Sequence, residues 1–247
     1  VAEQANQAKS RYISAISHEL RTPLNSILGY AQLLGEDANI LPNRRQAVNV
    51  IRRGGEHLLS LIEGTLDIAR IESGKLTLER RSLRLADELH EMASLFEVQA
   101  AAKGLQFVFD VQGDIPAVVR GDGKRVRQIL INLLGNAIKF TGSGRVVLRV
   151  RHAREMAWID VEDTGPGLSP DEVERIFEPF ARGDSAGGRA PGAGLGLTIA
   201  KMLTELMGGE LTVTSVLGQG AAFHVKLFLP ELHDGAAPPV ERPGLAR

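Results

Sequence analysis

Two long amphipathic stretches, separated by a short run of helix breakers, constrain the first third of the chain most strongly. The breakers are Gly35, Asn39 and Pro42, which predict a turn. A second stretch with apolar residues at helical spacing follows over residues 43–73. The pattern therefore predicts an antiparallel helical hairpin. At about 100° per residue, the apolar stripe of the first helix consists of Ile13, Ile16, Leu20, Leu24, Ile27, Ala31 and Leu34.

A hairpin offers each stripe only one other helix to pack against. Complete burial of stripes this long requires further helices, so we expect two chains to pair as a homodimer with a four-helix bundle. The alternative is that the second domain of the same chain covers the stripes. Because the stripes run the full length of both helices, the dimer is the preferred interpretation.

His18 lies almost opposite the apolar stripe of the first helix, where we expect solvent. Thr22 and Asn25 share its face, and Glu19 lies beside it. A neutral imidazole next to a carboxylate can act as a nucleophile, a general base or a metal ligand. A single exposed histidine is usually just solvated, but Pro23 removes a helical hydrogen bond beside it and marks unusual local geometry.

The composition describes an ordinary globular protein. The 247 residues carry a net charge of -1 and no cysteine, which excludes a polybasic nucleic-acid binder, disulfides and thiolate metal sites. No apolar run approaches the roughly 20 residues of a membrane span, so we expect no direct membrane contact and a cytoplasmic location. The sequence begins at Val1 rather than Met and is expected to be part of a longer protein.

From Lys75 the pattern changes to interleaved strands and helices, which predicts an α+β sandwich with helices on one face of a mixed sheet. The expected domains are a hairpin over residues 1–74, an α+β domain over 75–230 and a Pro-rich tail or linker over 231–247. The expected helices cover residues 85–96, 122–140 and 195–207, and the expected strands cover residues 76–78, 107–111, 118–120, 145–152, 157–163, 211–213 and 223–229.

The expected helix over residues 122–140 has a polar face with Gln128, Asn132, Asn136 and Lys139. Carboxamide oxygens suit a Mg²⁺ ion that takes most of its negative ligands from phosphates, and a lysine adds a point charge for those phosphates. The alternative is an ordinary solvated helix face.

Two glycine-rich loops favour the phosphate interpretation. The loop at 163–167 follows a strand, so Asp163 can accept a hydrogen bond from an exocyclic amine such as that of adenine, and its glycines let backbone approach a flat ligand. The loop at 187–197 leads into a helix whose free amides suit phosphate oxygens. A simple turn is the alternative for each loop, and neither matches a Walker or Rossmann fingerprint.

Taken together, the chain resembles the transmitter region of sensor histidine kinases of two-component systems, a HisKA hairpin followed by a Bergerat-fold ATPase domain. The resemblance covers about residues 9–229, and five motifs occur in the family's order. They are Ser-His-Glu-Leu-Arg-Thr-Pro-Leu at 17–24, Asn-Leu-Leu-Gly-Asn-Ala-Ile-Lys-Phe at 132–140, Asp-Thr-Gly-Pro-Gly at 163–167, Phe-Glu-Pro-Phe at 177–180 and Gly-Ala-Gly-Leu-Gly-Leu at 192–197.

The resemblance implies an ATP- and Mg²⁺-dependent kinase in which His18 attacks the γ-phosphate with Glu19 as its proton partner. Arg182 would offset charge during transfer, and Thr22 would orient water for a phosphatase activity. Asn136 would hold Mg²⁺. The remaining nucleotide contacts it implies are Asn132, Lys139, Phe140, Asp163, Gly165, Gly167, Gly192, Gly194, Leu195 and Gly196.

The residues of the expected helix over 122–140 distinguish a kinase from an enzyme that hydrolyses ATP. No Asp or Glu occurs from Gly123 to Phe140, so no carboxylate there can activate water, and transfer to His18 is favoured over hydrolysis. The next acceptor implied is an aspartate of a response-regulator receiver domain, separate or fused beyond the C-terminus. A phosphatase-dominant sensor and a nucleotide-binding scaffold without transfer remain alternatives. A hinge near residues 73–75 and weak packing between the domains are also expected.

Overall fold

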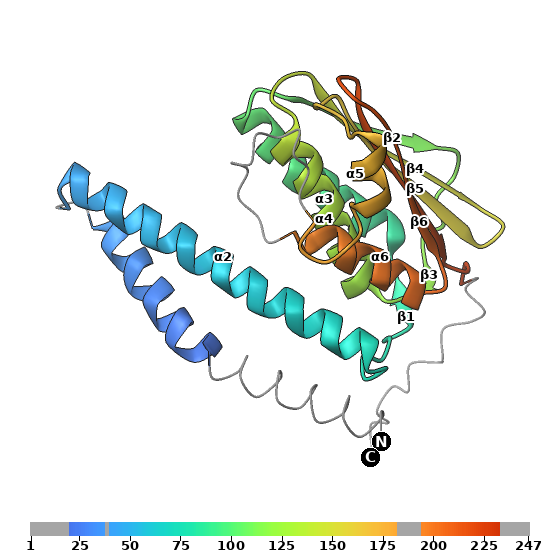
Figure 1. The fold of residues 1–247 in the computed structure, drawn as a ribbon. Helices are drawn as coiled ribbons and strands as arrows, with labels where there is room; N and C mark the ends of the chain where they lie inside the picture. Colours follow the sequence, from blue (N-terminus) through green and yellow to red (C-terminus); the bar gives the residue numbers. More distant parts are fainter. Residues whose placement is uncertain (1–19, 38–39, 182–193, 233–247) are drawn as a thin grey trace, which may run out of the picture.

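The computed structural model describes residues 20–37, 40–181 and 194–232. An antiparallel helical hairpin opens this part of the chain. Residues 20–36 are helical, and α2 spans Pro42–Glu72. The helices approach closely at Gly55, where a Cβ atom would lie 2.8 Å from Leu28 Cδ2. Figure 1 shows the hairpin as the long blue and cyan arm beside the rest of the molecule.

Each helix of the hairpin buries only part of its apolar stripe. Leu24 and Ala31 are buried on the first helix. Three other stripe residues remain exposed, with Leu20, Ile27 and Leu34 at 46%, 52% and 51%. On α2, Val50, Ile51 and Leu58 are likewise exposed. Much of the apolar surface that the sequence predicts to be buried is therefore open in the single chain.

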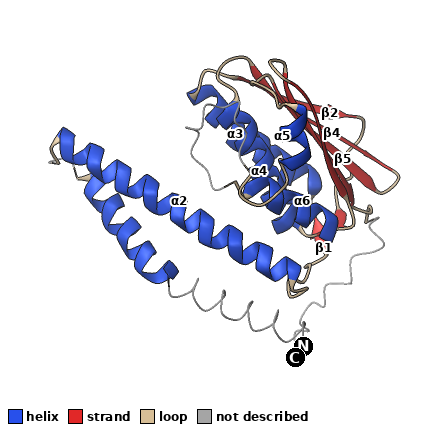
Figure 2. Ribbon diagram, viewed as in Figure 1, coloured by secondary structure: helices blue, strands red, loops and turns tan. Residues whose placement is uncertain are grey.

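The rest of the described chain forms a sheet with helices on one face, as the sequence predicts (Figures 1 and 2). The five-stranded sheet has the order β2-β4-β5-β7-β6. All neighbours are antiparallel except β2 and β4, which are parallel. The strands are β2 (Gln106–Gln112), β4 (Arg145–Ala153), β5 (Met156–Asp163), β6 (Glu210–Val216) and β7 (Gly220–Phe228). A separate pair joins β1 (Arg81–Leu83) to β3 (Val119–Gly121).

The core lies between this sheet and three helices, α3 (Leu85–Ala102), α4 (Gly123–Phe140) and α6 (Gly196–Leu206). Every second residue of the central strands points into it, which gives the alternation seen at Val146, Leu148 and Val150. The apolar stripe predicted for α4 is confirmed as buried: Val126, Ile129, Leu130, Leu133, Leu134 and Ala137. A short helix, α5 (Pro170–Arg175), was not predicted, although Ser169 and Glu172 form a capping box at its start.

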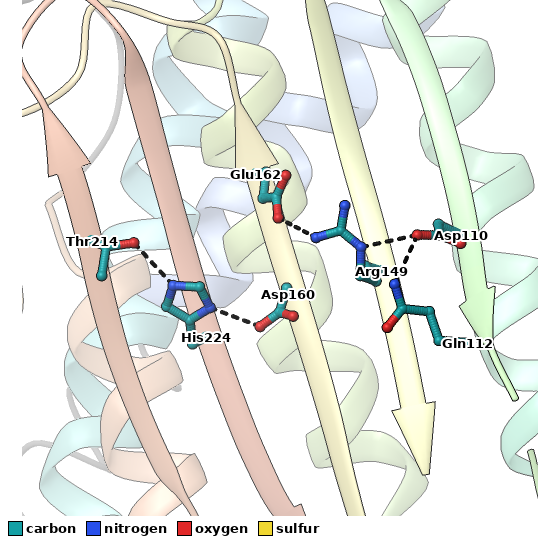
Figure 3. A network of polar contacts seen from close by, with 7 residues as sticks. All are labelled: Asp110, Gln112, Arg149, Asp160, Glu162, Thr214 and His224. Carbon is teal, nitrogen blue, oxygen red and sulfur yellow. Dashed lines mark hydrogen bonds and ion pairs between the residues drawn. The ribbon is translucent and has the colours of Figure 1, made fainter.

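Charged residues cover the opposite face of the sheet. Figure 3 shows Arg149 between Asp110, at 2.9 Å, and Glu162. These hydrogen bonds, first that to Asp110, raise the pKa of the Arg149 guanidinium further above its ordinary value. The His224 ring lies between Asp160, at 2.8 Å, and Thr214, at 3.0 Å. Cross-strand pairs of this kind stabilise the strand register.

The segment between the hairpin and β1 differs from the prediction. The expected strand over Leu76–Leu78 is wrong: these residues have no regular secondary structure, and the strand is β1 instead. Leu76 is buried, and the Glu79 amide donates to Asp122 Oδ2 at 2.9 Å. The other oxygen of Asp122 accepts from the Arg125 amide and caps α4. The segment is thus held by the start of α4 rather than by a neighbouring strand.

The hairpin packs directly against the helical layer, where the sequence analysis expected weak packing. Leu61, Ile68 and Ile71 of α2 lie against the core. A Cβ atom at Gly64 would lie 3.0 Å from Leu195 Cδ1 and 3.2 Å from Ile199 Cδ1. The absence of a side chain at Gly64 therefore allows α2 and α6 to approach closely. In the described ranges, no helix is long and apolar enough to cross a membrane.

Candidate functional site

A pocket opens between α4, the end of β5, the loop after β5, α6 and β7. It brings together four residues that the sequence analysis selects, Asn136, Phe140, Asp163 and Gly167. The rest of the lining is mostly apolar and suits a flat ring. It consists of Ala137, Pro166, Leu168, Ile176, Leu197, Ala221 and Phe223.

Asp163 supplies an acidic group to this lining. It is the last residue of β5, and its Oδ1 accepts a hydrogen bond from the Gly165 amide at 2.8 Å. Burial raises the pKa of this carboxyl above its ordinary value, while the backbone amides of Gly165 and Ala221 act in the opposite direction. A half-buried carboxylate at the edge of an apolar slot can accept a hydrogen bond from an amine on a bound ring.

The loop after β5 requires glycine at two positions. Gly167 has a φ of +68°, and a Cβ atom there would overlap the Val216 carbonyl oxygen. A Cβ atom at Gly165 would lie 2.8 Å from Asp163 Oδ1, in the space that the carboxylate occupies. Both glycines therefore maintain the shape of this wall of the pocket.

Helix α4 contributes two carboxamides one turn apart, as the sequence predicts. Asn136 lines the pocket. Asn132 lies against the first residue of α6, since a Cβ atom at Gly196 would be 3.3 Å from Asn132 Oδ1. The Asn132 Nδ2 atom is buried and has no hydrogen-bond partner among the described residues. A buried, unpaired donor at this point fits a polar ligand group between α4 and α6.

Phe140 and Lys139 lie at the last turn of α4. The Phe140 ring is 37% exposed and forms part of the pocket wall. The Lys139 ammonium lies 4.3 Å from the centre of that ring, within the range of a cation–π interaction. The arrangement places an aromatic face and a positive charge next to each other at the pocket.

The start of α6 forms another boundary of the site. Gly194 has a φ of +70°, and its carbonyl accepts from the Phe180 amide at 3.0 Å. Leu195 is 2% exposed, and α6 begins without a side-chain cap. The first amides of an uncapped helix are suitable donors for phosphate oxygens.

Among the described residues, Thr22 is a predicted residue that does not line this pocket. Thr22 lies on the exposed side of the hairpin, where its carbonyl accepts from Ser26 Oγ at 3.2 Å. His18, Glu19, Arg182 and Gly192 lie outside the described residues.

Several residues that line the pocket could not be identified from the sequence. Ile176 carries no motif signal, whereas Phe223 reads only as one inward residue of a strand. Leu197 ends the last glycine-rich motif but was not predicted to belong to the site. Apolar lining residues are hard to separate from core residues in a sequence, because the same residue types serve both.

Two family models match the chain. The His Kinase A phospho-acceptor domain matches residues 8–74, and the histidine kinase-, DNA gyrase B- and HSP90-like ATPase matches residues 121–231. Together the two models cover most of the chain in the order that the motifs predict.

The similar proteins are longer than this chain. The chain is 40% identical over 241 residues to the sensor protein GacS of Pseudomonas syringae pv. syringae, covering 94% of this chain and 26% of that protein. It is 37% identical over 233 residues to the autoinducer 2 sensor kinase/phosphatase LuxQ of Vibrio vulnificus strain YJ016, covering 92% of this chain and 27% of that protein. The chain thus spans about a quarter of the length of these relatives.

A solved structure has the same fold over nearly the whole chain. Full-length ShkA in complex with AMPPNP superposes with a TM-score of 0.75 at 37% identity, covering 93% of this chain and 47% of that one. The domain matches, the relatives and this structure agree on one assignment. The chain belongs to the sensor histidine kinase family.

Proposed function

We propose that this chain is an ATP-dependent protein-histidine autokinase that phosphorylates His18 and passes the phosphoryl group to an aspartate of a response-regulator receiver domain. One observation carries the proposal most. The pocket combines Asp163, an acceptor for an amine, with a helix that presents Asn132 and Asn136 but no carboxylate from Gly123 to Phe140. Such a site can bind a nucleotide without activating water against it. The AMPPNP complex of ShkA supports ATP as the ligand.

The transfer step follows from the chemistry of the two reactants. A neutral ring nitrogen of His18 attacks the γ-phosphorus of ATP, so that an N–P bond forms while the bond from phosphorus to the β,γ-bridging oxygen breaks. ADP leaves with that electron pair, and Glu19 takes up or orients the proton on the other ring nitrogen. In the second step the N–P bond breaks as a carboxylate oxygen of the receiver aspartate bonds to phosphorus.

The cation for this reaction would be Mg²⁺, held by the Asn136 side-chain oxygen together with phosphate oxygens. Asn132 lies one turn away, and an amide oxygen adds no charge to a site whose negative ligands come from the nucleotide. Bound there, Mg²⁺ would neutralise phosphate charge. Lys139 and Arg182 would meet the phosphates from the protein side, and the backbone of Gly192, Gly194, Leu195 and Gly196 would approach them.

The exposed half of the hairpin supports a homodimer. Ile27, Leu34 and Leu58 are among its large apolar side chains that remain about half exposed or more in one chain. Two copies that cover these residues would form the four-helix bundle expected for a phospho-acceptor hairpin. We assign this role to residues 1–74, ATP binding to 75–230, and a linker or tail to 231–247.

The proposal is tested with γ-labelled ATP and Mg²⁺. We expect label on the protein that is labile in acid and stable in alkali, as a phosphoramidate is, and that is absent from His18→Gln. Because the lining residues of the pocket lie between Asn136 and Phe223, the variant should retain nucleotide binding. Label that persists in His18→Gln would overturn the assignment of the phosphorylated residue. Bound ATP without any label would favour the nucleotide-binding scaffold.

A phosphatase activity toward the receiver phosphoaspartate is the second candidate. Thr22 lies on the exposed side of the hairpin helix, one turn from His18 in the sequence, and the relative LuxQ is named a kinase/phosphatase. We expect Thr22→Ala to slow dephosphorylation of the receiver while autophosphorylation persists. The matched control is Thr22→Ser, which retains the hydroxyl. Equal dephosphorylation by the Ala variant and the wild type would remove Thr22 from this role.

A further inference from the structure

A lysine from a different helix holds the last turn of α4. Lys103 follows the end of α3, and its Nζ atom lies 2.6 Å from the Ile138 carbonyl oxygen and 2.7 Å from the Lys139 carbonyl oxygen. Both carbonyls belong to the turn that carries the side chains of Lys139 and Phe140. The ammonium group therefore contacts the backbone of the pocket wall from outside the pocket.

The carbonyls in the last turn of a helix lack partners within the helix, and the negative end of the helix dipole lies there. In α4 these carbonyls are satisfied by two groups. The Ala137 oxygen accepts from the Thr141 amide and from Thr141 Oγ1. Lys103 supplies donors for the next two carbonyls and places a positive charge at the negative end of the dipole.

A second hydrogen bond joins the same two segments. The Gln106 amide, at the start of β2, donates to the Gly144 carbonyl oxygen at 3.0 Å. Residues 103–106 thus contact both the last turn of α4 and the loop that follows it. The Lys103 side chain itself is largely exposed and does not line the pocket, so its loss would remove these bonds without opening a cavity in the core.

We propose that Lys103 is a positioning residue for the nucleotide. It fixes the backbone of Ile138 and Lys139 and thereby the orientation of the Phe140 ring and the Lys139 ammonium at the pocket. This inference rests on the proposed nucleotide-binding function. It predicts an effect on nucleotide affinity rather than on the chemical step, because the bonds of Lys103 are to the backbone of the pocket wall.

The test compares three variants of the full chain. Lys103→Met keeps the length of the side chain and removes the charge, and Lys103→Arg keeps a donor that can reach both carbonyls. Lys124→Met is the matched control, because Lys124 lies on the exposed side of the opposite end of α4. The measurements are Kd for ADP by calorimetry, KM and kcat for ATP in autophosphorylation, and Tm.

For Lys103→Met we expect Kd and KM to rise about two- to fivefold, the factor that corresponds to the typical contribution of a cation at a helix C-terminus. We expect kcat to stay within about twofold and Tm to fall by no more than about 4 °C. Lys103→Arg should restore affinity, and Lys124→Met should match the wild type. Unchanged Kd and KM in Lys103→Met, an equal loss in Lys124→Met, or a fall in kcat alone would each overturn the inference.

The two proposals fail in distinguishable ways. Wild-type protein that binds ADP but takes no label would overturn the proposed kinase function, while the comparison of Kd values would still decide the role of Lys103. Wild-type protein that binds no nucleotide would overturn both.

Discussion

The side-chain amide of Gln128 donates a hydrogen bond to the Asp67 carboxylate across 2.7 Å, and this bond joins α2 to α4. Arg125 Nη1 donates in turn to Gln128 Oε1 at 2.9 Å, which fixes the orientation of the amide. The hairpin is therefore attached to α4 by a polar contact, in addition to the apolar contacts that Gly64 and Ile68 make with the rest of the domain. If His18 is phosphorylated by ATP, the kinase must change this arrangement during its cycle.

Gln128→Glu is expected to separate α2 from α4. It places a second carboxylate against Asp67, and like charges at this distance repel by about 1–4 kcal/mol. The ratio of attached to separated molecules should fall by about tenfold or more. Because the chain has no cysteine, spin labels at Arg53→Cys and Gln112→Cys, diluted with unlabelled protein, would report a broader and longer distance distribution.

The double variant Asp67→Asn with Gln128→Glu is the control for this prediction. It restores a donor and an acceptor with exchanged roles, and Arg125 can still bond to the new carboxylate. We expect the narrow distribution to return. A Gln128→Glu protein with an unchanged distribution would mean that the apolar contacts alone hold the two helices together.

Two glycines of α2 should respond differently to the same added methyl group. A Cβ atom at Gly54 meets no other atom within 4 Å, whereas one at Gly64 lies 3.0 Å from Leu195 Cδ1. Gly54→Ala should raise the free energy of unfolding by about 0.5–1 kcal/mol, the usual difference between alanine and glycine in a helix. Gly64→Ala should gain less or lose stability, because Leu195 and Ile199 must move. Urea unfolding measures both, and equal gains would contradict the close contact.

Asp163→Asn should change the pH dependence of the free energy of unfolding, and this effect can be measured separately from nucleotide binding. Because burial raises the folded-state pKa of Asp163 above the ordinary value of 3.8, its contribution to stability is complete below that value and is lost as pH rises through the folded pKa. Asparagine has no such loss. The free energy of unfolding of the variant relative to the wild type, measured without nucleotide, should therefore rise between pH 3.8 and the folded-state pKa of Asp163. Above that pKa the difference should remain constant.

The same variant should bind ADP at least about tenfold more weakly at pH 7, because one acceptor oxygen becomes a donor while the other already accepts from the Gly165 amide. A pH-independent difference in stability would show that the hydrogen bonds from Gly165 and Ala221 offset the burial of the charge.

Asn132→Leu tests the buried amide of α4. Its Nδ2 atom has no partner among the described residues, and an unsatisfied buried donor costs about 1–3 kcal/mol. The variant should be as stable as the wild type or more stable in the absence of nucleotide, yet lose about tenfold or more in ADP affinity. Asn132→Asp, which has the same shape, should lose stability because it buries a charge, and it should lose affinity because that charge would repel the phosphates. Loss of stability in Asn132→Leu would indicate a structural role instead.

Periodicity was sufficient to predict most of the fold. The buried stripe of α4 and the alternation along β4 and β5 follow directly from residue spacing, since both elements have one apolar and one polar face. Leu76 and Leu78 show where this reasoning fails. They alternate like a strand but have no regular secondary structure, and the segment is held instead by Asp122, a residue distant in sequence whose carboxylate accepts from the Glu79 amide.

The contact between α2 and α6 could not be predicted from the sequence either. It depends on the missing side chain of Gly64, a residue that the helical pattern of the sequence does not single out. The pocket was partly predictable, because Asn136, Phe140, Asp163 and Gly167 carry polar, aromatic or conformational signals. Its apolar lining was not, since Ala221 and Ile176 look like ordinary core residues.

The dual role of Asp122 gives α4 a mechanical property. One carboxylate binds both the first turn of α4 and the segment that leaves the hairpin, while the other end of the same helix carries Phe140 and Lys139. Eighteen helical residues make a stiff rod of about 27 Å. The connection between the hairpin and the sheet therefore cannot move away from α4 unless the hydrogen bond between Glu79 and Asp122 breaks.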